Sequence, residues 1–458
     1  MVRRMKRLKP AATSAFAPAL ARRRMSRRDF LKVTGVGLAG TSLLGVAGCT
    51  GGGGGSSGEF TVTFGPEESG SLQNAIDRFN EEYSGQYTAN YREMPADTGQ
   101  HFDQLQTELQ AGSSEFDLIG ADVIWPAQLA SQGFILDLSD RFTQDQQNEF
   151  LPATIEAMTY NGSVWGVPWR TDAGMLYYRQ DLLEENGFNN PPTTWDELKQ
   201  MARTVQQQSG TRYGFIFQGA DYEGGVTNAL EYIWSSGGEV VDPNNPDRVL
   251  IDSSEAREGL SIERSTIDDG VAPESVATFK EQEVQSTFLA GDAVFARHWP
   301  VMYGLISNPD ESSLTTDQVG VAPLPVASES DQNASCLGGW NWCINTFSAN
   351  QEAAWEFIKF FTSAEQLKTG ALEGNLLPTR RELYEDQELV EEVPVIPLAR
   401  EAAENTRPRP VSPYYQDMSL RMAEQFNAAL NGDVSPEEAT QTLQGELTEI
   451  IEQGQAQR

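Results

Sequence analysis

Strand and helix patterns alternate along this chain from residue 60 onward, and this alternation restricts the fold more than any other feature of the sequence. Phe60, Val62 and Phe64 alternate with polar residues, which predicts a strand, and apolar residues at helical spacing follow directly. Such a βα alternation predicts an α/β fold with a mostly parallel sheet, whose ligands sit beyond the carboxyl ends of strands. Asp122 follows the strand-like segment 116–119 and falls at such an end.

Helix patterns continue to the end of the chain and dominate its last third. Thr194 and Glu197 have the spacing of a capping box, which predicts that a helix begins between them. Further helices are predicted at 226–236, 254–269, 351–362, 415–431 and 436–453.

The first 58 residues have the composition of a targeting segment. Arg27 and Arg28 stand ahead of a Phe-Leu-Lys run and resemble a twin-arginine export signal. The apolar stretch 33–47 is shorter than the roughly 20 residues that span a bilayer, so it is interpreted as the apolar part of a signal. The residues ending at Cys49 resemble a lipobox, which predicts that Cys49 is lipidated after cleavage. Residues 49–58, mostly Gly and Ser, would then form a flexible linker to an extracytoplasmic protein anchored to the cell membrane.

The net charge of the chain restricts its expected partners, and its length restricts its expected architecture. The whole chain carries a net charge of −33, and residues 1–48 hold eleven of its 33 Lys and Arg residues and one of its 66 acids. The mature protein would therefore carry about −43, so nucleic acid is not an expected partner, because its phosphates would be repelled. About 400 residues remain, which is more than one core normally holds, so we expect two lobes.

Most enzyme and cofactor sites are excluded by what the chain lacks. His101 and His298 are its only histidines, and neither lies in a recognisable catalytic motif. No nucleophile elbow, phosphate-binding loop or dinucleotide-binding fingerprint is present, and we predict neither a cofactor nor a metal. Paired carboxylates remain, so a secreted glycoside hydrolase is the enzymatic alternative.

Eight segments, in order and at family-like spacing, resemble the extracellular solute-binding proteins of ABC sugar importers, most closely their trehalose/maltose-binding branch. The segments are ADVIWP at 121–126, VPWRTDAGMLYYR at 167–179, PTTWDEL at 192–198, YEG at 222–224, FLAGDAVFARHWP at 288–300, GGW at 338–340, LPTR at 377–380 and RPRP at 407–410. No one segment is specific by itself, but together they cover nearly the whole mature chain.

The resemblance implies a periplasmic-binding-protein-like fold of type II, in which two lobes joined by a hinge close over a ligand. It implies a binding protein without enzymatic activity, which takes a disaccharide such as trehalose or maltose and delivers it to an ABC permease. A sugar-sensing module would use the same interlobe cleft for a different partner. The expected division is a signal at 1–48, a linker at 49–58, a first lobe of 59–171 with 301–361, and a second lobe of 172–300 with 362–458.

Carboxylates and a guanidinium are the expected hydrogen-bonding groups for sugar hydroxyls, because their charge-assisted bonds are strong. Asp122, at a strand end, and Asp172, beside the predicted lobe crossing, are the candidate acceptors, although either could instead cap a helix or turn. Glu68 is a third, with its neighbour Glu67 as an alternative; a charge at a helix N-terminus is the simpler role for it. Arg409, on a proline-stiffened segment, is the candidate donor, unless it is merely solvated.

Aromatic side chains are the expected surfaces for the apolar face of a sugar ring. Trp299 follows a strand-like run, and Trp340 follows a glycine pair whose second member, Gly339, lets the backbone approach a ligand. Trp169 and Tyr222 complete the predicted ligand contacts.

The segment CLGGWNWCIN at 336–345 concentrates two cysteines and two tryptophans. A metal clip at Cys336 and Cys343 has no obvious further ligands, so a disulfide is favoured over two buried thiols. If the segment is extended, Trp340 and Trp342 point to the same side. Both then line the cleft or both pack inward, and the sequence leaves this open.

Overall fold

The computed structural model describes residues 58–67, 69–96 and 98–456. Within these ranges no helix combines the length and the apolar character needed to cross a membrane. The predicted signal, Cys49 and Glu68 lie outside the described residues, and so does the linker apart from Gly58, which is the first residue of a strand.

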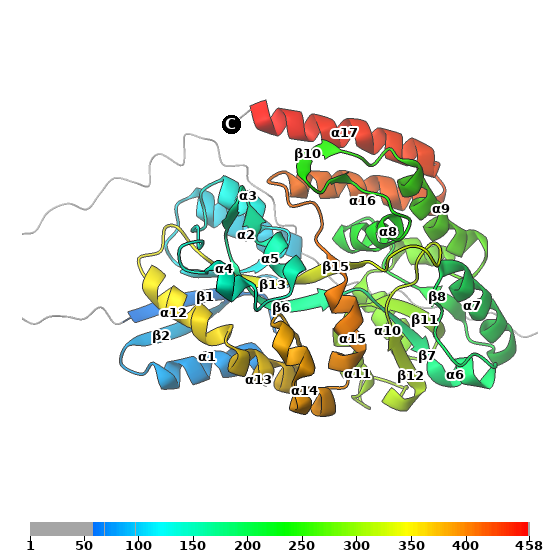
Figure 1. Ribbon diagram of the computed structural model, residues 1–458, viewed down its shortest axis with the longest axis horizontal. Coiled ribbons are helices and arrows are strands. Elements are labelled where there is room, and N and C mark those ends of the chain that lie inside the picture. Colours follow the sequence, from blue (N-terminus) through cyan, green and yellow to red (C-terminus); the bar gives the residue numbers. More distant parts are fainter. Residues whose placement is uncertain (1–57, 68, 97, 457–458) are drawn as a thin grey trace, which may run out of the picture. The chain divides into compact units, whose positions relative to one another are not determined.

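Seven strands form the first sheet, in the order β14-β6-β13-β3-β1-β2, with β15 beside β13 (Figure 1). Their bounds are β1 Gly58–Phe64, β2 Tyr87–Glu93, β3 Leu118–Asp122, β6 Val167–Ala173, β13 Ser335–Ile344, β14 Leu377–Pro378 and β15 Thr406–Arg407. β1 pairs parallel to β2 and β3, as the βα alternation predicts. β13 instead runs antiparallel to both β3 and β6, so this sheet is mixed.

A second, four-stranded sheet has the order β12-β7-β11-β8. Its strands are β7 Met175–Arg179, β8 Tyr213–Ile216, β11 Ala293–His298 and β12 Val319–Ala322. One residue, Gly174, separates β6 of the first sheet from β7 of the second. β6 therefore carries the chain from one sheet to the other, and β13 returns in the opposite direction, which explains its antiparallel pairing.

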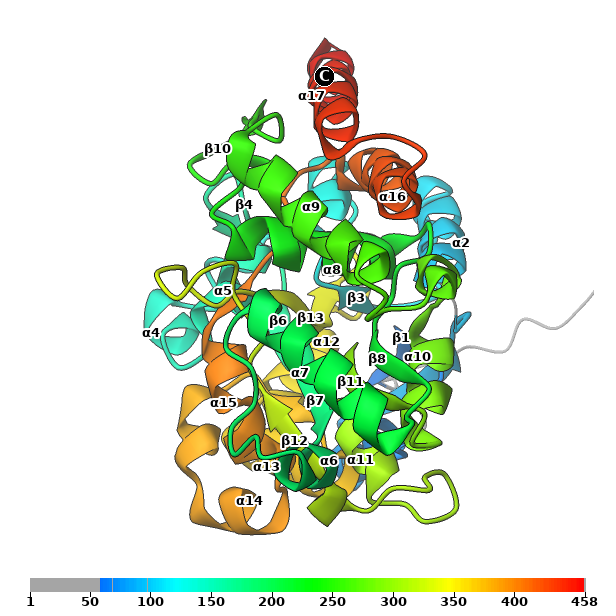
Figure 2. The same ribbon diagram turned by 90° about the vertical axis from the view of Figure 1, so that its right-hand side faces the viewer.

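Helices cover both sheets, so the predicted α/β class is confirmed. α1 Ser71–Glu82, α12 Gln351–Phe361 and α13 Ala364–Gly374 cover one face of the first sheet, and α2 Thr98–Gln110 lies on the other (Figure 1). α7 Trp195–Ser209 packs against the second sheet, while α8 Glu223–Ser235, α9 Ser254–Asp268, α16 Tyr415–Asn431 and α17 Pro436–Ala456 pack together beside it (Figure 2). The five helices predicted from 226 onward are all present.

The predicted capping box at the start of α7 is formed. Glu197 N donates to Thr194 Oγ1 at 3.2 Å, and Thr194 N donates to the Glu197 carboxylate at 3.3 Å.

The remaining elements are short. The other elements are α3 Pro126–Ser131, α4 Gln144–Gln147, α5 Pro152–Ala157, β4 Thr159–Tyr160, β5 Ser163–Val164, α6 Gln180–Glu185, β9 Val241–Asp242, β10 Asn245–Val249, α10 Glu281–Leu289, α11 Val301–Ile306, α14 Gln387–Glu392, α15 Val395–Glu404 and 3₁₀ turns at Glu274–Thr278, Thr316–Gln318 and Arg381–Glu385.

Strand pairing differs from the predicted lobe division at two points. Residues 319–322, expected in the first lobe, form β12 and pair with β7 in the second sheet. Residues 377–378, expected in the second lobe, form β14 and pair with β6 in the first sheet. The motif spacing could not place these crossings, because short edge strands carry little periodicity of their own.

Candidate functional site

Three residues from three adjacent strands of the first sheet stand in one row. Trp340 of β13 pairs with Asp122 at the end of β3 and with Arg170 of β6. Residues directly opposite one another on neighbouring strands point to the same face of a sheet. An acceptor, an aromatic ring and a donor therefore lie side by side, and we call them the 122–340–170 row.

Gly339 makes the close approach of the strands in this row possible. Its φ of +126° lies in a region that favours glycine, and a Cβ there would stand 2.3 Å from the carbonyl oxygen of Arg170. Its own carbonyl accepts from Val123 N at 3.3 Å, just after β3 ends. Gly339 thus serves the backbone pairing, which is a different role from the predicted direct ligand contact.

Trp340 is half-buried, and other rings hold it from behind. Phe64 and Trp125 meet it edge to face, with ring centroids at 4.7 and 5.6 Å, and the His101 ring lies nearly parallel to it at 6.1 Å. His101 is buried, and burial lowers its pKa to about 4, so the imidazole is neutral at physiological pH. The packing fixes the indole while part of it stays open to solvent, as a stacking surface requires.

Asp122 retains unused acceptor capacity. Its Oδ1 accepts from Ile124 N at 3.2 Å and lies 3.7 Å from Nη2 of Arg409, but a carboxylate offers about four lone-pair sites. Burial raises the pKa of Asp122 to about 6, and the charge of Arg409 opposes that rise. Its side chain is 16% exposed, which leaves the acid within reach of a ligand.

Asp172 and Trp299 both lie beside Gly338. Asp172 belongs to β6 of the first sheet, and Trp299 directly follows β11 of the second sheet. A Cβ added at Gly338 would lie 3.0 Å from Cβ of Asp172 and 3.3 Å from Cζ3 of Trp299. Both side chains are half-buried, and burial raises the pKa of Asp172 while the charge of Arg170 lowers it. Trp299 follows β11 and lies against the guanidinium of Arg297, 4.0 Å from its ring centroid. Trp299 therefore brings the end of a strand of the second sheet against Gly338, two residues before Trp340 of the row.

The buried Arg409 and the half-buried Glu223 form a link between elements. Nη1 of Arg409 donates to Glu223 Oε1 at 2.5 Å and Nη2 donates to the carbonyl of Leu337 at 3.1 Å. Glu223, the first residue of α8, also accepts from the hydroxyls of Tyr415, at 2.6 Å, and Ser419. The expected ligand donor is thus largely engaged in protein contacts. Sequence reasoning missed Glu223 as its partner, although Glu223 lies in one of the resembling segments.

The side chains of Tyr222 and Glu67 form hydrogen bonds with other groups of the protein. The Tyr222 hydroxyl donates to Glu281 Oε2 at 2.7 Å, and burial raises the pKa of that hydroxyl. The Glu67 carboxylate accepts from the backbone N–H groups of Ser69, at 3.0 Å, and Leu72, at 3.2 Å. Glu67 therefore serves the N-terminus of α1. Its neighbour Glu68, the predicted contact, is outside the described residues.

Trp169 and Trp342 belong to the core. Trp169 is 3% exposed and stacks on Trp342, with ring centroids 5.2 Å apart and planes at 16°. The pairing of β13 with β6 shifts register here, from Trp340 opposite Arg170 to Asn341 opposite Pro168, and so passes over Trp169. The bulge turns the indole inward, which corrects the prediction of a ligand contact. Trp342 is fully buried, although it shares the contact with Phe64 that Trp340 makes.

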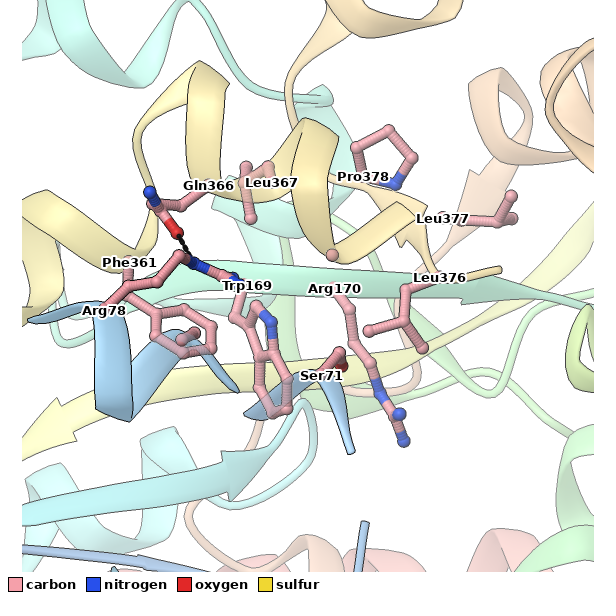
Figure 3. Close-up of a pocket in the computed structure, with 12 residues that line it drawn as sticks. Ser71, Arg78, Trp169, Arg170, Phe361, Gln366, Leu367, Leu376, Leu377 and Pro378 are labelled. Atoms are coloured by element: carbon pink, nitrogen blue, oxygen red, sulfur yellow. Dashed lines mark hydrogen bonds between the residues drawn. The ribbon is translucent and has the colours of Figure 1, made fainter. Parts of the chain in front are cut away.

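A small pocket lies beside β6 at this point (Figure 3). Trp169, Arg170, Arg78 and Leu376 are among the residues that line it, and Nε of Arg78 donates to Gln366 there at 2.9 Å. The guanidinium of Arg170 points away from Leu377 and Pro378, on the opposite side of the strand (Figure 3). Arg170 was not among the predicted contacts, although it lies in a resembling segment.

The predicted disulfide is wrong. Cys336 and Cys343 are free and buried, and both lie in β13. An extended strand rises about 3.3 Å per residue, so their Cα atoms stand roughly 23 Å apart, and a disulfide requires less than about 7 Å. Cys336 packs with α8 and α16, while Cys343 packs with Trp125 and α2. In the described part of the chain no group of three or more His, Cys, Asp or Glu residues could hold a metal.

Comparisons with known proteins identify the family and agree with the observed fold. Residues 65–368 match the family model described as bacterial extracellular solute-binding protein. A probable ABC transporter-binding protein of Deinococcus radiodurans is 32% identical over 370 residues, which cover 79% of this chain and 86% of the relative. The maltotriose-binding protein of Pyrococcus abyssi is 26% identical over 296 residues, covering 63% of this chain and 60% of the relative.

Among solved structures, T. maritima MalE3, described as maltose bound, is 38% identical and superposes with a TM-score of 0.77. The match covers 85% of this chain and 98% of that one, so the two sheets correspond to the two lobes of a maltose-binding-protein-like fold. Proteins of this kind bind a solute and catalyse no reaction. The chain belongs to the bacterial extracellular solute-binding proteins.

Proposed function

We propose that this protein binds a disaccharide, trehalose or a maltose-like sugar, outside the cell and delivers it to an ABC permease. The observation that carries the proposal is the half-buried Trp340 ring with Asp122 directly opposite it on the neighbouring strand. A pyranose presents a weakly apolar face and a rim of hydroxyls. An indole with an acceptor at its edge matches both features at once.

Asp172 and Trp299 extend the proposed site towards the second sheet. Trp299 offers a second aromatic surface from the end of β11, and Gly338 keeps the space between it and Asp172 small. In binding proteins of two lobes, hinge closure brings such surfaces together around the ligand. We therefore propose that one sugar ring stacks on Trp340 and that the other meets Trp299 when the lobes close.

The relatives support the sugar class. T. maritima MalE3 is described as maltose bound, and the P. abyssi relative is described as maltotriose-binding. Linkage is the finer question, because α-1,1 and α-1,4 disaccharides carry similar hydroxyl groups and differ mainly in shape.

Thermal unfolding with a panel of mono-, di- and trisaccharides tests the ligand class. A ligand that binds only the folded state stabilises it by about 2.7 kcal/mol at a hundred times its dissociation constant, so the melting temperature must rise. We expect maltose and trehalose to give the largest shifts. If peptides or polyamines raise the transition and no sugar does, the proposed ligand class is wrong.

Two further measurements separate transport from the alternatives. Chromatography of maltose and trehalose after incubation should return them uncleaved, and cleavage products would instead support a glycoside hydrolase. Delivery predicts that the sugar-loaded protein stimulates ATP hydrolysis by its ABC permease complex. A sugar-sensing module would bind the same ligands without that stimulation.

The lipid anchor is a separate proposal that rests on the sequence of residues 1–58. We expect the mature protein to begin at Cys49 and to carry a diacylglyceryl group, which mass spectrometry of its N-terminal peptide would detect. Cys49→Ser should release the protein from the membrane fraction, and replacing Arg27 and Arg28 with lysines should block export. Membrane retention of the serine variant would overturn the anchor.

A further inference from the structure

Arg170 is a charged side chain with idle donors. It forms no hydrogen bond or ion pair with any residue in 58–67, 69–96 or 98–456, and its Nε is buried without a partner. Its charge reaches Asp172 only at a distance, where it lowers the pKa of that carboxyl. A guanidinium presents five N–H donors, and a buried donor that is left without a partner, such as this Nε, carries a cost.

Two aromatic rings hold this guanidinium without occupying its donors. Its central carbon lies 5.9 Å from the ring centroid of Phe64 and 5.5 Å from that of Trp169. Such cation–π contacts use the face of the guanidinium, while its N–H groups radiate in its plane. Phe64 also packs against Trp340, so one ring sets the position of both the donor and the stacking surface.

The 122–340–170 row sets the distance between the backbones that carry the acceptor and the donor. Neighbouring strands lie about 4.8 Å apart, so the backbones of Asp122 and Arg170 are separated by about 10 Å, with Trp340 midway between them. A sugar ring centred on the indole would then have the strand that carries the acceptor on one side and the strand that carries the donor on the other. Arg409, by contrast, already donates to Glu223 and to the backbone of Leu337.

We propose that Arg170 contacts the ligand and donates to a hydroxyl of the sugar ring that stacks on Trp340, opposite the edge held by Asp122. This inference rests on the proposed function and deepens it, since it makes Arg170 a determinant of which hydroxyl pattern is bound. A neutral sugar is the ligand that fits, because Asp122 and Asp172 flank the same position and would repel an anion.

The test is calorimetric binding of maltose and trehalose to Arg170→Met, which keeps an apolar stem and removes the donors. We expect affinity to fall about 10- to 100-fold, the worth of a charge-assisted hydrogen bond, with the melting temperature of the free protein unchanged. Arg170→Lys should recover part of the loss. Arg212→Met is the matched control, because Arg212 is an exposed arginine that also lies over an aromatic ring, that of Tyr213, and its loss should leave affinity unchanged.

Single-deoxy analogues of the bound sugar distinguish a contact from a general disturbance. The analogue that lacks the hydroxyl held by Arg170 should bind the wild-type protein more weakly than the parent sugar does. The Arg170→Met variant should bind that analogue and the parent sugar equally well. An equal loss for every analogue, or wild-type affinity in Arg170→Met, would overturn the assignment while the proposed function stands. A wild-type protein that binds no sugar would overturn the proposed function itself.

Discussion

Two arginines near the meeting point of the sheets show opposite uses of the same side chain. The side chain of Arg170 is half-buried and forms no hydrogen bond or ion pair with the described residues, whereas the side chain of Arg297 is 2% exposed and donates a hydrogen bond from each of its three nitrogens. Nε and Nη2 of Arg297 fork onto the two carboxylate oxygens of Glu231, at 2.8 and 2.5 Å. A paired, buried guanidinium holds the architecture together, and an unpaired, half-buried one is available to a ligand.

The junction around Arg297, made of Gly174, Glu231, Arg297 and Cys336, joins the two sheets. Glu231 Oε1 accepts from the backbone N of Cys336, in β13, at 3.0 Å, while Arg297 lies in β11. A Cβ at Gly174, between β6 and β7, would stand 2.0 Å from Glu231 Oε1 and 2.5 Å from Nη2 of Arg297. The crossing residue is therefore glycine because the ion pair fills the place of a side chain.

The largest expected effect comes from breaking this ion pair. Arg297→Met leaves Glu231 buried and charged with only one backbone donor, which should lower the free energy of unfolding by about 3–5 kcal/mol in denaturant titrations. Arg170→Met should change it by less than about 0.5 kcal/mol. Adding Glu231→Leu to Arg297→Met should restore much of the loss, since no unpaired charge then remains. Equal stabilities of the two single variants would remove the distinction between the two arginines.

Trp340 and Trp342 extend the contrast to neighbouring positions on one strand. Trp340→Ala should cost about 2–4 kcal/mol of sugar affinity with little change in fold, measured by calorimetry. Trp342→Ala should instead lower the free energy of unfolding by about 3–5 kcal/mol, because it empties a fully buried site, and leave the affinity of the folded fraction near that of wild type. Unchanged binding by Trp340→Ala would mean that no ligand stacks on it.

Asp122 should make binding and stability depend on pH in opposite directions. Its folded pKa of about 6 lies above the ordinary 3.8, so the stability of the protein, relative to Asp122→Asn, is greatest below pH 4. That stability should fall by about 1–3 kcal/mol as pH rises to 6 and stay level above it. Sugar affinity should instead rise roughly tenfold from pH 5 to 7, as the carboxylate acceptor forms.

Asp122→Asn is the control for both profiles. The amide keeps an acceptor for Ile124 N, while Arg409 stays paired with Glu223, so the fold should survive. The stability and the sugar affinity of Asp122→Asn should no longer depend on pH near pH 6. If the variant retains either change, another group titrates there; Asp172, whose pKa burial also raises, is the first to examine.

Periodicity predicted the helices well, because an amphipathic face is written in the local sequence. The bounds of α9 and α16 were predicted to within one residue, since apolar spacing and caps mark them. The direction of β13 was not predictable in this way. A buried strand looks alike in either direction, and only the return of the chain from the second sheet decides it.

The candidate site was predicted through its motifs and less well through individual residues. Asp122 and Trp340 were each proposed from a local signal, a strand end and a glycine pair, and their pairing on neighbouring strands was not predicted. Arg409 was predicted as a ligand donor, and its bond to Glu223 was not predicted because Glu223 lies 186 residues away in sequence. Trp169 was misassigned because a register shift between β13 and β6 leaves no mark in composition.

The smallest expected effect is that of reductant on the two cysteines of β13. These cysteines allow the region that joins the sheets and the region behind Trp340 to be compared on a single strand. Cys336 lies at the junction and Cys343 in the core behind Trp340, and burial raises the pKa of each thiol to about 12, so neither forms a thiolate at neutral pH. Both cysteines are free thiols, so both should react with a thiol reagent when a protein beginning at Gly58 is denatured without reductant. Reductant should change neither that count nor the melting temperature. Only one strand separates the two cysteines, so a count that rises with reductant would require β13 to bend back on itself, and the pairing of Trp340 with Asp122 and Arg170 would be lost with it.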